Sequence, residues 1–445
     1  MAAGPLWLHR VQILVGPDQE PVRAGDALIG ADGVLEALGA EAVARARQLD
    51  LAPTEAGPWL LAPVLVDPHS VLEEPWAGPA ETLSSLAAAA AAGGYGTVAL
   101  LPWARPWRDR PERLGLRWDP PLELRLWGSF SRDGADADLA CHAEQIEAGA
   151  VGLAAAAECP PWPLLERGLL LAEAGDAPVL VAPRLAALTS GGFVREGVES
   201  LRAGWPPDPV HSELLPLQAL LSLAQGPATR SLVLMNLSTA AAVEALAGSP
   251  RPPAATVCWW HLVADSASLA PTAEGWRLEP SLGTPRDRQA LIDALAAGLL
   301  QGVAVHHQPL DAEERLLPLD QRRPGVAGHG GRHGLVLPSL WQELVALRGW
   351  TPGQLWQVLS WGPSRLLRQE PEQLSVGSRR WLLFDPWAEQ GPGAGNAGTG
   401  GGPSLAANQP LLDRPPRGMV RATGLRVADQ WRLEPLPPAA DSPPA

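Results

Sequence analysis

Short apolar runs alternate with longer stretches of helical character along most of this chain. The runs typical of buried strands lie at residues 97–101, 122–127, 151–154, 178–181, 231–235, 254–258 and 302–305. The stretches typical of helices lie at residues 80–92, 140–148, 163–174, 216–224, 240–247 and 286–300. Repeated strand–helix alternation predicts a parallel sheet covered by helices on both faces. At this chain length, a closed α/β barrel of the TIM-type (β/α)8 class is the leading arrangement.

The two ends of the chain carry a different pattern. Strands are predicted at residues 6–14, 27–29 and 381–384, and the apolar run 60–66 is predicted as one strand despite Pro63 inside it. Glycine dominates residues 391–402, which predicts a flexible loop. The proline-rich residues 435–445 are expected to form a frayed tail.

The composition is that of a globular protein, since 46% of the 445 residues are hydrophobic and 18% are charged. A net charge of -14 argues against a nucleic-acid surface, which needs clustered basic residues. No apolar run reaches the ~18–20 residues of a membrane helix, and no signal peptide is expected. The cysteines, Cys141, Cys159 and Cys258, form no C-x-x-C pair, which fits a reduced, cytoplasmic chain.

The sequence contains no lysine, so every basic side chain other than histidine is arginine. Arginine stays protonated and cannot replace lysine as a Schiff base, a general base or a carbamylated metal bridge. These kinds of catalysis are therefore excluded for this chain.

Several segments, in order along the chain, resemble the motifs of dihydroorotases, members of the amidohydrolase superfamily. Residues 61–75, LAPVLVDPHSVLEEP, are similar to the first-strand motif P-G-x-x-D-x-H-x-H-L-R-E-P. Further similar segments lie at 81–102, 149–154, 237–240, 286–310, 312–315, 362–365, 383–386 and 408–420.

The resemblance implies an amidohydrolase barrel at residues 61–374. It also implies a composite β-sandwich domain, built from residues 1–60 and 375–445, that includes the 391–402 loop and the tail.

In this family, divalent zinc lowers the pKa of water and polarises the scissile carbonyl. The resemblance places His69 at the first histidine ligand and Val71 at the second. Glu73 falls where the family has an arginine that binds the substrate carboxylate, which reverses the charge. Trp103 falls where a substrate-binding asparagine is expected.

The remaining ligand positions are also changed. The resemblance places Ala154 at the bridging lysine, Ala182 and Asn236 at histidines, and His306 at the catalytic aspartate. His307 keeps the next histidine. Together with Val71, Glu73 and Trp103, these residues predict a degenerate active site with no intact catalytic group, no bound metal and no cofactor.

The remnant histidines leave one alternative. His69, His261, His306 and His307 could meet at the barrel mouth as a new metal site. Ordinary hydrogen-bonded histidines are the simpler interpretation, because no carboxylate accompanies them at matching motif positions.

Three functions follow as hypotheses. The first is a pseudoenzyme linked to pyrimidine biosynthesis, because inactive dihydroorotase homologues assemble with aspartate transcarbamoylase; this is family analogy. The second is an active divergent dihydroorotase or another cyclic-amide hydrolase. The third is a small-molecule sensor that uses the barrel mouth. No nucleic acid or membrane partner is expected, and a homo-oligomer is compatible with the sequence.

Overall fold

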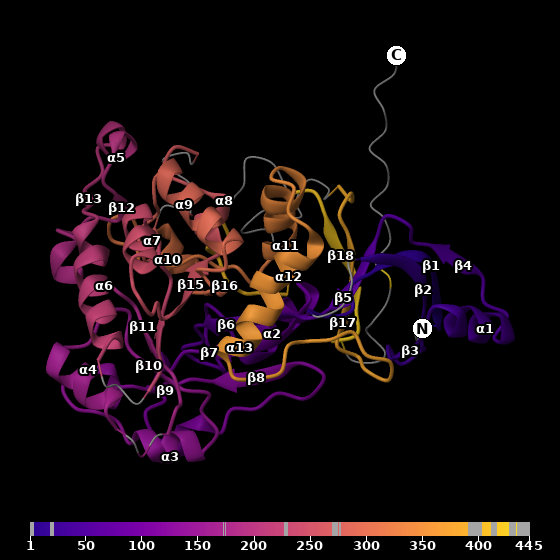
Figure 1. Cartoon of the computed structure of the whole chain (residues 1–445), viewed down its shortest axis with the longest axis horizontal. Coiled ribbons are helices and arrows are strands. Elements are labelled where there is room, and N and C mark those ends of the chain that lie inside the picture. Colours follow the sequence, from indigo (N-terminus) through magenta and orange to yellow (C-terminus); the bar gives the residue numbers. More distant parts are fainter. Residues whose placement is uncertain are drawn as a thin grey trace.

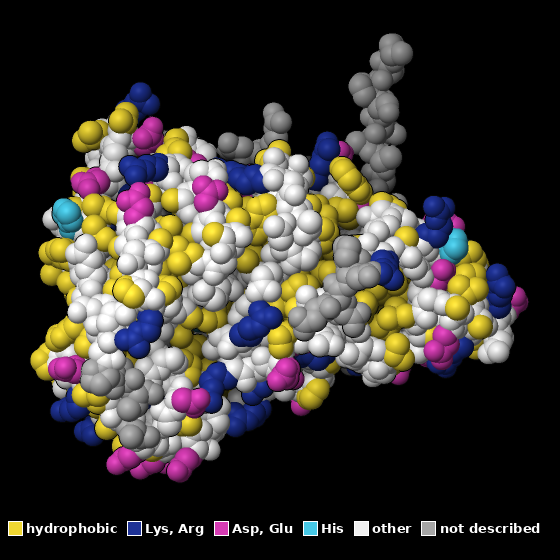
Figure 2. All heavy atoms as spheres, viewed as in Figure 1, with side chains coloured by type: hydrophobic (Ala, Val, Ile, Leu, Met, Phe, Trp, Pro, Cys, Tyr) yellow, Lys and Arg dark blue, Asp and Glu magenta, His cyan; other side chains and the backbone are white. Residues whose placement is uncertain are grey.

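A computed structural model describes residues 4–17, 22–171, 173, 175–226, 230–268, 275, 277–389, 403–410, 416–426 and 433. The predicted glycine-rich loop 391–402 and the predicted tail 435–445 lie outside these residues. Within the described part of the chain, no helix is both long and apolar enough to cross a membrane. Arginine and acidic side chains are interspersed on the face shown in Figure 2.

A barrel of parallel strands forms the larger part of the molecule (Figure 1). Its strands are β6 (Leu65–Ser70), β7 (Tyr95–Leu100), β8 (Glu123–Leu126), β9 (Gly128–Ser129), β10 (Leu153–Ala154), β11 (Val179–Val181), β14 (Leu232–Leu234), β15 (Ala254–Cys258) and β16 (Gly302–Ala304). They pair in the orders β6-β7-β8 and β9-β10-β11-β14-β15-β16. Trp127 joins β8 to β9, so one bent strand belongs to both sheets. The peptide N–H of Val71 donates to the carbonyl of His307 (2.8 Å), which ties the end of β6 to the segment after β16 and closes the barrel.

Helices cover the outside of the barrel (Figure 1). They include α2 (Leu83–Ala92), α3 (His142–Glu147), α4 (Trp162–Leu169), α6 (His211–Ala224), α7 (Ala240–Ala247), α9 (Pro285–Ala296), α11 (Val336–Leu340), α12 (Pro352–Trp356) and α13 (Gly362–Leu366). Shorter helices, α5 (Val198–Ala203), α8 (Trp260–Val263) and α10 (Ala312–Leu316), lie in the connections.

Local chemistry moves several helix ends away from their predicted positions. Helix α2 begins at Leu83 rather than at residue 80, because Thr82 and Ser85 form a capping box at its start. Helix α9 ends at Ala296 rather than at residue 300, because Gly298 just after it takes a positive φ of 72°. Helix α6 begins at His211, before Pro216, the residue at which the prediction started.

The interior of the barrel is filled by apolar side chains. Val66, Ala99, Leu180 and Val233 belong to one buried cluster with Trp127, whose indole N–H donates to the Pro68 carbonyl (2.9 Å). The barrel is therefore a packed core and not a pore.

A second sheet combines both ends of the chain and lies to one side of the barrel (Figure 1). Its order is β18 (Met419–Thr423), β17 (Trp381–Asp385), β5 (Leu60–Pro63), β1 (Leu6–Ile13), β2 (Arg23–Ile29) and β3 (Leu35–Leu38), with β4 (Pro53–Glu55) paired to β1. Helix α1 (Ala40–Gln48) packs beside β2 and β3. The predicted β-sandwich built from both chain ends is confirmed by the fold, while its exact boundaries at residues 60 and 375 stay a prediction.

The prediction of one strand over residues 60–66 is wrong, because the run divides at Val64. Strand β5 pairs with β1 and β17 of the small sheet, and β6 pairs with β7 of the barrel. The Trp356 indole N–H donates to the Pro63 carbonyl (2.9 Å), and the Ser360 hydroxyl donates to the Val64 carbonyl (2.7 Å). Side chains thus satisfy these two carbonyls where the chain passes from one sheet to the other.

Candidate functional site

A pocket lies where the carboxyl ends of the barrel strands meet. Asn236 follows β14 and His306 follows β16, while Trp103 and Ala182 follow β7 and β11. Strand ends at this face of a (β/α)8 barrel carry the active sites of enzymes with this fold. The sequence therefore placed these four residues at the functional end of the barrel.

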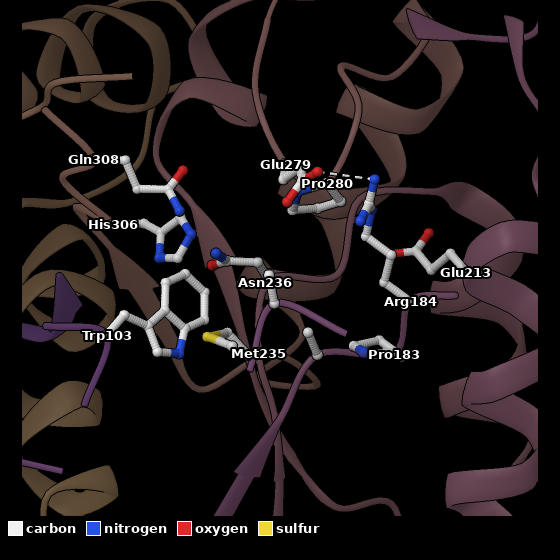
Figure 3. Close-up of a pocket in the computed structure, with 12 residues that line it drawn as sticks. Trp103, Pro183, Arg184, Glu213, Met235, Asn236, Glu279, Pro280, His306 and Gln308 are labelled. Carbon is white, nitrogen blue, oxygen red and sulfur yellow. Dashed lines mark ion pairs between the residues drawn. The ribbon is translucent and has the colours of Figure 1, made fainter. Parts of the chain in front are cut away.

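The pocket is small and mixed in character, with about 340 Å³ of space that includes solvent at its mouth. Figure 3 shows Asn236 between Trp103 and His306 on one side and the Arg184–Glu279 ion pair on the other. The full set of lining residues is Trp103, Ala157, Ala182, Pro183, Arg184, Glu213, Met235, Asn236, Glu279, Pro280, His306 and Gln308.

His69 and His306 face each other beside this pocket. Their Nδ1 atoms are 3.1 Å apart, and the His69 Nε2 atom is 2.9 Å from the Thr256 hydroxyl. Burial, followed by the neighbouring His306, holds the pKa of His69 well below its usual value. Burial also lowers the pKa of His306 to about 4. Both rings are therefore neutral at pH 7 and share a hydrogen bond.

Asn236 is a buried polar residue of the pocket with an unusual backbone conformation. Its backbone takes a positive φ of 55°, and its N–H donates to the Thr256 hydroxyl (3.0 Å). The residue is 2% exposed, yet neither the nitrogen nor the oxygen of its amide has a hydrogen-bond partner in the described part of the chain. A buried amide without partners costs about 1–3 kcal/mol, so this group is suited to pair with something that enters the pocket.

Val71 and Ala154 have no part in the polar chemistry of the site. Both side chains are buried in the apolar cluster inside the barrel. Trp103 packs against that cluster, and its indole N–H donates to the Ala155 carbonyl (2.9 Å). Its ring lies edge-on to His306, with the centroids 6.1 Å apart.

Glu73 does not line the pocket. Its carboxylate pairs with Arg105 (3.1 Å) and Arg323 (2.5 Å) in a separate depression. The charge reversal expected from the sequence is thus compensated by these two arginines and does not face the pocket.

A second buried network supports the same strand ends. The Asp67 carboxylate accepts from the Val305 N–H (3.0 Å), the Ser70 hydroxyl (2.5 Å) and the His329 ring (3.0 Å). The Ser70 oxygen accepts from the N–H of His307 (2.8 Å). Asp67 therefore fixes β6 to the segment that follows β16.

His307 continues this network away from the pocket. Its Nε2 atom is 3.2 Å from Glu81, and Glu81 also accepts from the Ser404 hydroxyl. Burial alone would raise the pKa of Glu81, but its interactions with His307 and its hydrogen bonds with Ser404 and Ser85 together lower that pKa. Sequence reasoning did not identify Glu81 or Thr256 as parts of the site.

Sequence reasoning also did not identify two acidic residues that line the pocket, Glu213 and Glu279. Burial raises the pKa of Glu279, although Arg184 lies 2.9 Å away. Burial likewise raises the pKa of Glu213, which accepts from the Ser238 N–H (2.7 Å) and lies 3.6 Å from Arg195. Glu213 is the single acidic residue of the largely apolar helix α6, and this isolated charge is the sequence signal that could have identified it.

The donor set does not fit the zinc that the family implies. Zinc sites use at least three protein ligands from histidine, cysteine and carboxylate side chains. The nitrogens of His69 and His306 face each other here, while the side chains of Val71, Ala154 and Ala182 offer no lone pair. Among the described residues, no group of three or more histidine, cysteine, aspartate or glutamate side chains is placed to hold a metal.

His261 does not join His69 and His306 in direct contact. Its Nε2 atom is 3.3 Å from the Ser281 carbonyl, and none of the described residues provides a hydrogen-bond partner for its Nδ1 atom. Burial lowers the pKa of His261 to about 4, with a further lowering from Arg195.

This histidine should make stability depend on pH. Because the unfolded pKa is near 6.5, the unfolded chain binds more protons as the pH falls, and stability decreases. The wild type should lose about 1.4 kcal/mol more than His261→Gln between pH 8 and 5.5, which stays above the isoelectric point of 5.1. Urea unfolding at both pH values measures this difference. His211→Gln, at an exposed position, should keep the wild-type slope; equal slopes in wild type and His261→Gln would contradict the assignment.

Solved structures share this fold over nearly the whole chain. An L-hydantoinase (dihydropyrimidinase) of Arthrobacter aurescens has a TM-score of 0.72 and 17% identity, and the match covers 98% of this chain and 96% of that one. A dihydropyrimidinase of Brevibacillus agri has a TM-score of 0.71 and 16% identity, covering 97% and 95%. The fold and the position of the pocket thus define an amidohydrolase-type barrel with a small β-sandwich domain.

Proteins with similar sequences identify the family within this class of fold. A probable dihydroorotase-like protein of Synechocystis sp. is 32% identical, and the match covers 74% of this chain and 80% of the relative. A dihydroorotase-like protein of Pseudomonas aeruginosa is 28% identical, and the match covers 84% of this chain and 88% of that relative. The chain belongs to the dihydroorotase-like family of amidohydrolases and is a cyclic-amide-hydrolase-like protein. No model of a protein family matches the sequence.

Proposed function

We propose that this protein does not catalyse the hydrolysis of dihydroorotate and acts instead as a structural or regulatory component. One observation carries the proposal: the strand ends that should hold zinc place two neutral histidines, His69 and His306, against each other. Without a metal ligand at Val71, Ala154 or Ala182, the site has no means to activate water in the manner of the family. The absence of lysine from the sequence supports the same conclusion.

The test is zinc content and turnover of the purified full-length protein. We expect zinc well below one ion per chain after incubation with zinc and desalting, and no hydrolysis of dihydroorotate, dihydrouracil or hydantoin above the buffer rate. Stoichiometric zinc together with turnover that His69→Ala abolishes would overturn the proposal. That result would instead support an active divergent dihydroorotase or another cyclic-amide hydrolase.

The resemblance to dihydroorotases supports aspartate transcarbamoylase as the partner and pyrimidine biosynthesis as the setting. Free thiols at Cys141, Cys159 and Cys258 are compatible with a cytoplasmic location. Size-exclusion chromatography of the chain, alone and mixed with aspartate transcarbamoylase from the same organism, tests this partner. Co-elution at a larger size is the expected result, and the chain run alone reports any homo-oligomer.

A second candidate function, that of a small-molecule sensor, rests on Asn236. Its amide, which has no partner among the described residues, offers a donating NH2 group and an accepting carbonyl oxygen side by side within the pocket. If the chain and aspartate transcarbamoylase elute separately, aspartate transcarbamoylase is excluded as the partner. The sensor function is then the better candidate.

A further inference from the structure

A broad hollow lies at the end of the barrel opposite to the pocket. It is lined where β11, β14 and β15 begin, and by residues at the end of α13. Its space is about 1050 Å³, which includes solvent at its mouth. The described residues that line it include four arginines, Arg230, Arg251, Arg365 and Arg368, and one acidic residue, Asp176.

Arg230 is the buried member of this group and is only 3% exposed. Its Nε atom donates to the Ala177 carbonyl (2.9 Å), and its Nη1 atom lies 3.1 Å from His142 Nδ1 and 3.3 Å from the Gly168 carbonyl. These acceptors are neutral, and the buried Nη2 atom has no hydrogen-bond partner among the residues that the structure describes. Burial lowers the pKa of Arg230 to about 10, so the guanidinium remains charged at pH 7.

The exposed arginines leave the hollow with uncompensated positive charge. Arg251 donates to the Gln225 carbonyl (2.9 Å), and Arg368 pairs with Asp176 (2.8 Å). Within the described residues, no carboxylate lies within ion-pair distance of Arg230, Arg251 or Arg365. Four arginines less one aspartate give a local charge of +3, although the whole chain carries -14.

We propose that this hollow is a binding site for a multiply charged oxyanion of the phosphate class. The planar guanidinium fork matches the oxygens of phosphate and can donate two hydrogen bonds to it. Several positive charges around one hollow favour an anion with two or more charges over a monocarboxylate. The open mouth leaves room for either free phosphate or the phosphate group of a larger metabolite.

The hollow is separate from the pocket at the other end of the barrel. Val233 lines the hollow and Met235 lines the pocket, and both belong to the same packed cluster around β14. Binding in the hollow is therefore independent of whether the pocket hydrolyses anything.

Isothermal titration calorimetry of the full-length protein tests the site, with phosphate, pyrophosphate, ribose 5-phosphate and acetate as probes at matched ionic strength. We expect binding of phosphate and pyrophosphate, and weaker or no binding of acetate. Arg251→Gln combined with Arg365→Gln should weaken phosphate binding about tenfold or more, because each substitution removes a positive charge and a charge-assisted hydrogen-bond donor from the hollow.

Controls separate this site from general attraction of anions. Arg202→Gln alters an arginine on α5 whose side chain is 77% exposed, and it should bind phosphate like the wild type. Arg230→Lys keeps the charge but loses the fork, and should weaken binding. Free phosphate binding without ribose 5-phosphate binding supports a free oxyanion as ligand, and equal binding supports a phosphate ester. No binding of phosphate or pyrophosphate, equal affinity in the double variant, or acetate binding as tightly as phosphate would each overturn the proposal.

Discussion

Replacing Asp67 with alanine is expected to lower the free energy of unfolding by about 3–5 kcal/mol. The carboxylate is fully buried and accepts hydrogen bonds from the backbone of Val305, the hydroxyl of Ser70 and the ring of His329. Alanine leaves all three donors buried without an acceptor, and each such donor costs about 1–3 kcal/mol. Urea unfolding followed by tryptophan fluorescence measures the loss.

Two further variants define the cause of this loss. Asp67→Asn keeps an oxygen for the Val305 N–H and should cost less than the alanine variant. Asp138→Ala removes an exposed carboxylate and should change stability by less than about 0.5 kcal/mol. If Asp67→Ala were no more destabilising than Asp138→Ala, the network around β6 and β16 would not contribute to stability.

A comparable loss, about 3–5 kcal/mol, is expected for Trp381→Ala in the small sheet. The Trp381 side chain is fully buried in β17, packs in the cluster that includes Leu8 and Leu383, and donates its indole N–H to the Gly33 carbonyl (2.9 Å). Alanine creates a large cavity and leaves that carbonyl without its donor. The unfolding free energy from urea titrations again reports the effect.

The chain offers a matched control for this substitution. Trp387 follows the same strand, but it is 68% exposed, so Trp387→Ala should change stability by less than about 0.5 kcal/mol. Similar losses in both tryptophan variants would contradict the assignment of Trp381 to the core.

Much of the fold could be predicted because its cause is local. The apolar run 254–258 became β15, and the alanine-rich stretch 240–247 became α7 with the predicted bounds. Strand-like runs separated by helical stretches can close only in a few ways, and one of them is the observed barrel. The division at Val64 could not be predicted in this way, since it depends on Trp356 and Ser360, which lie far along the chain.

The site was harder to predict for the same reason. The motif positions placed Trp103, Asn236 and His306 at the barrel mouth, because each lies two or three residues after the end of a strand. The partners of these residues carry no local signal: Thr256 lies within β15, and the Arg184–Glu279 pair joins two separate loops. Which side chains satisfy one another is decided by tertiary packing, and one sequence does not record it.

The passage at Val64 has a mechanical consequence. A single residue separates β5 from β6, and the carbonyls on both sides of this point are held by Trp356 and Ser360. Because β5 and β6 are both paired within their sheets, this residue cannot act as a hinge, and a rotation of the small sheet would also rotate the first barrel strand. A partner that binds the small sheet would therefore also fix the orientation of the barrel mouth.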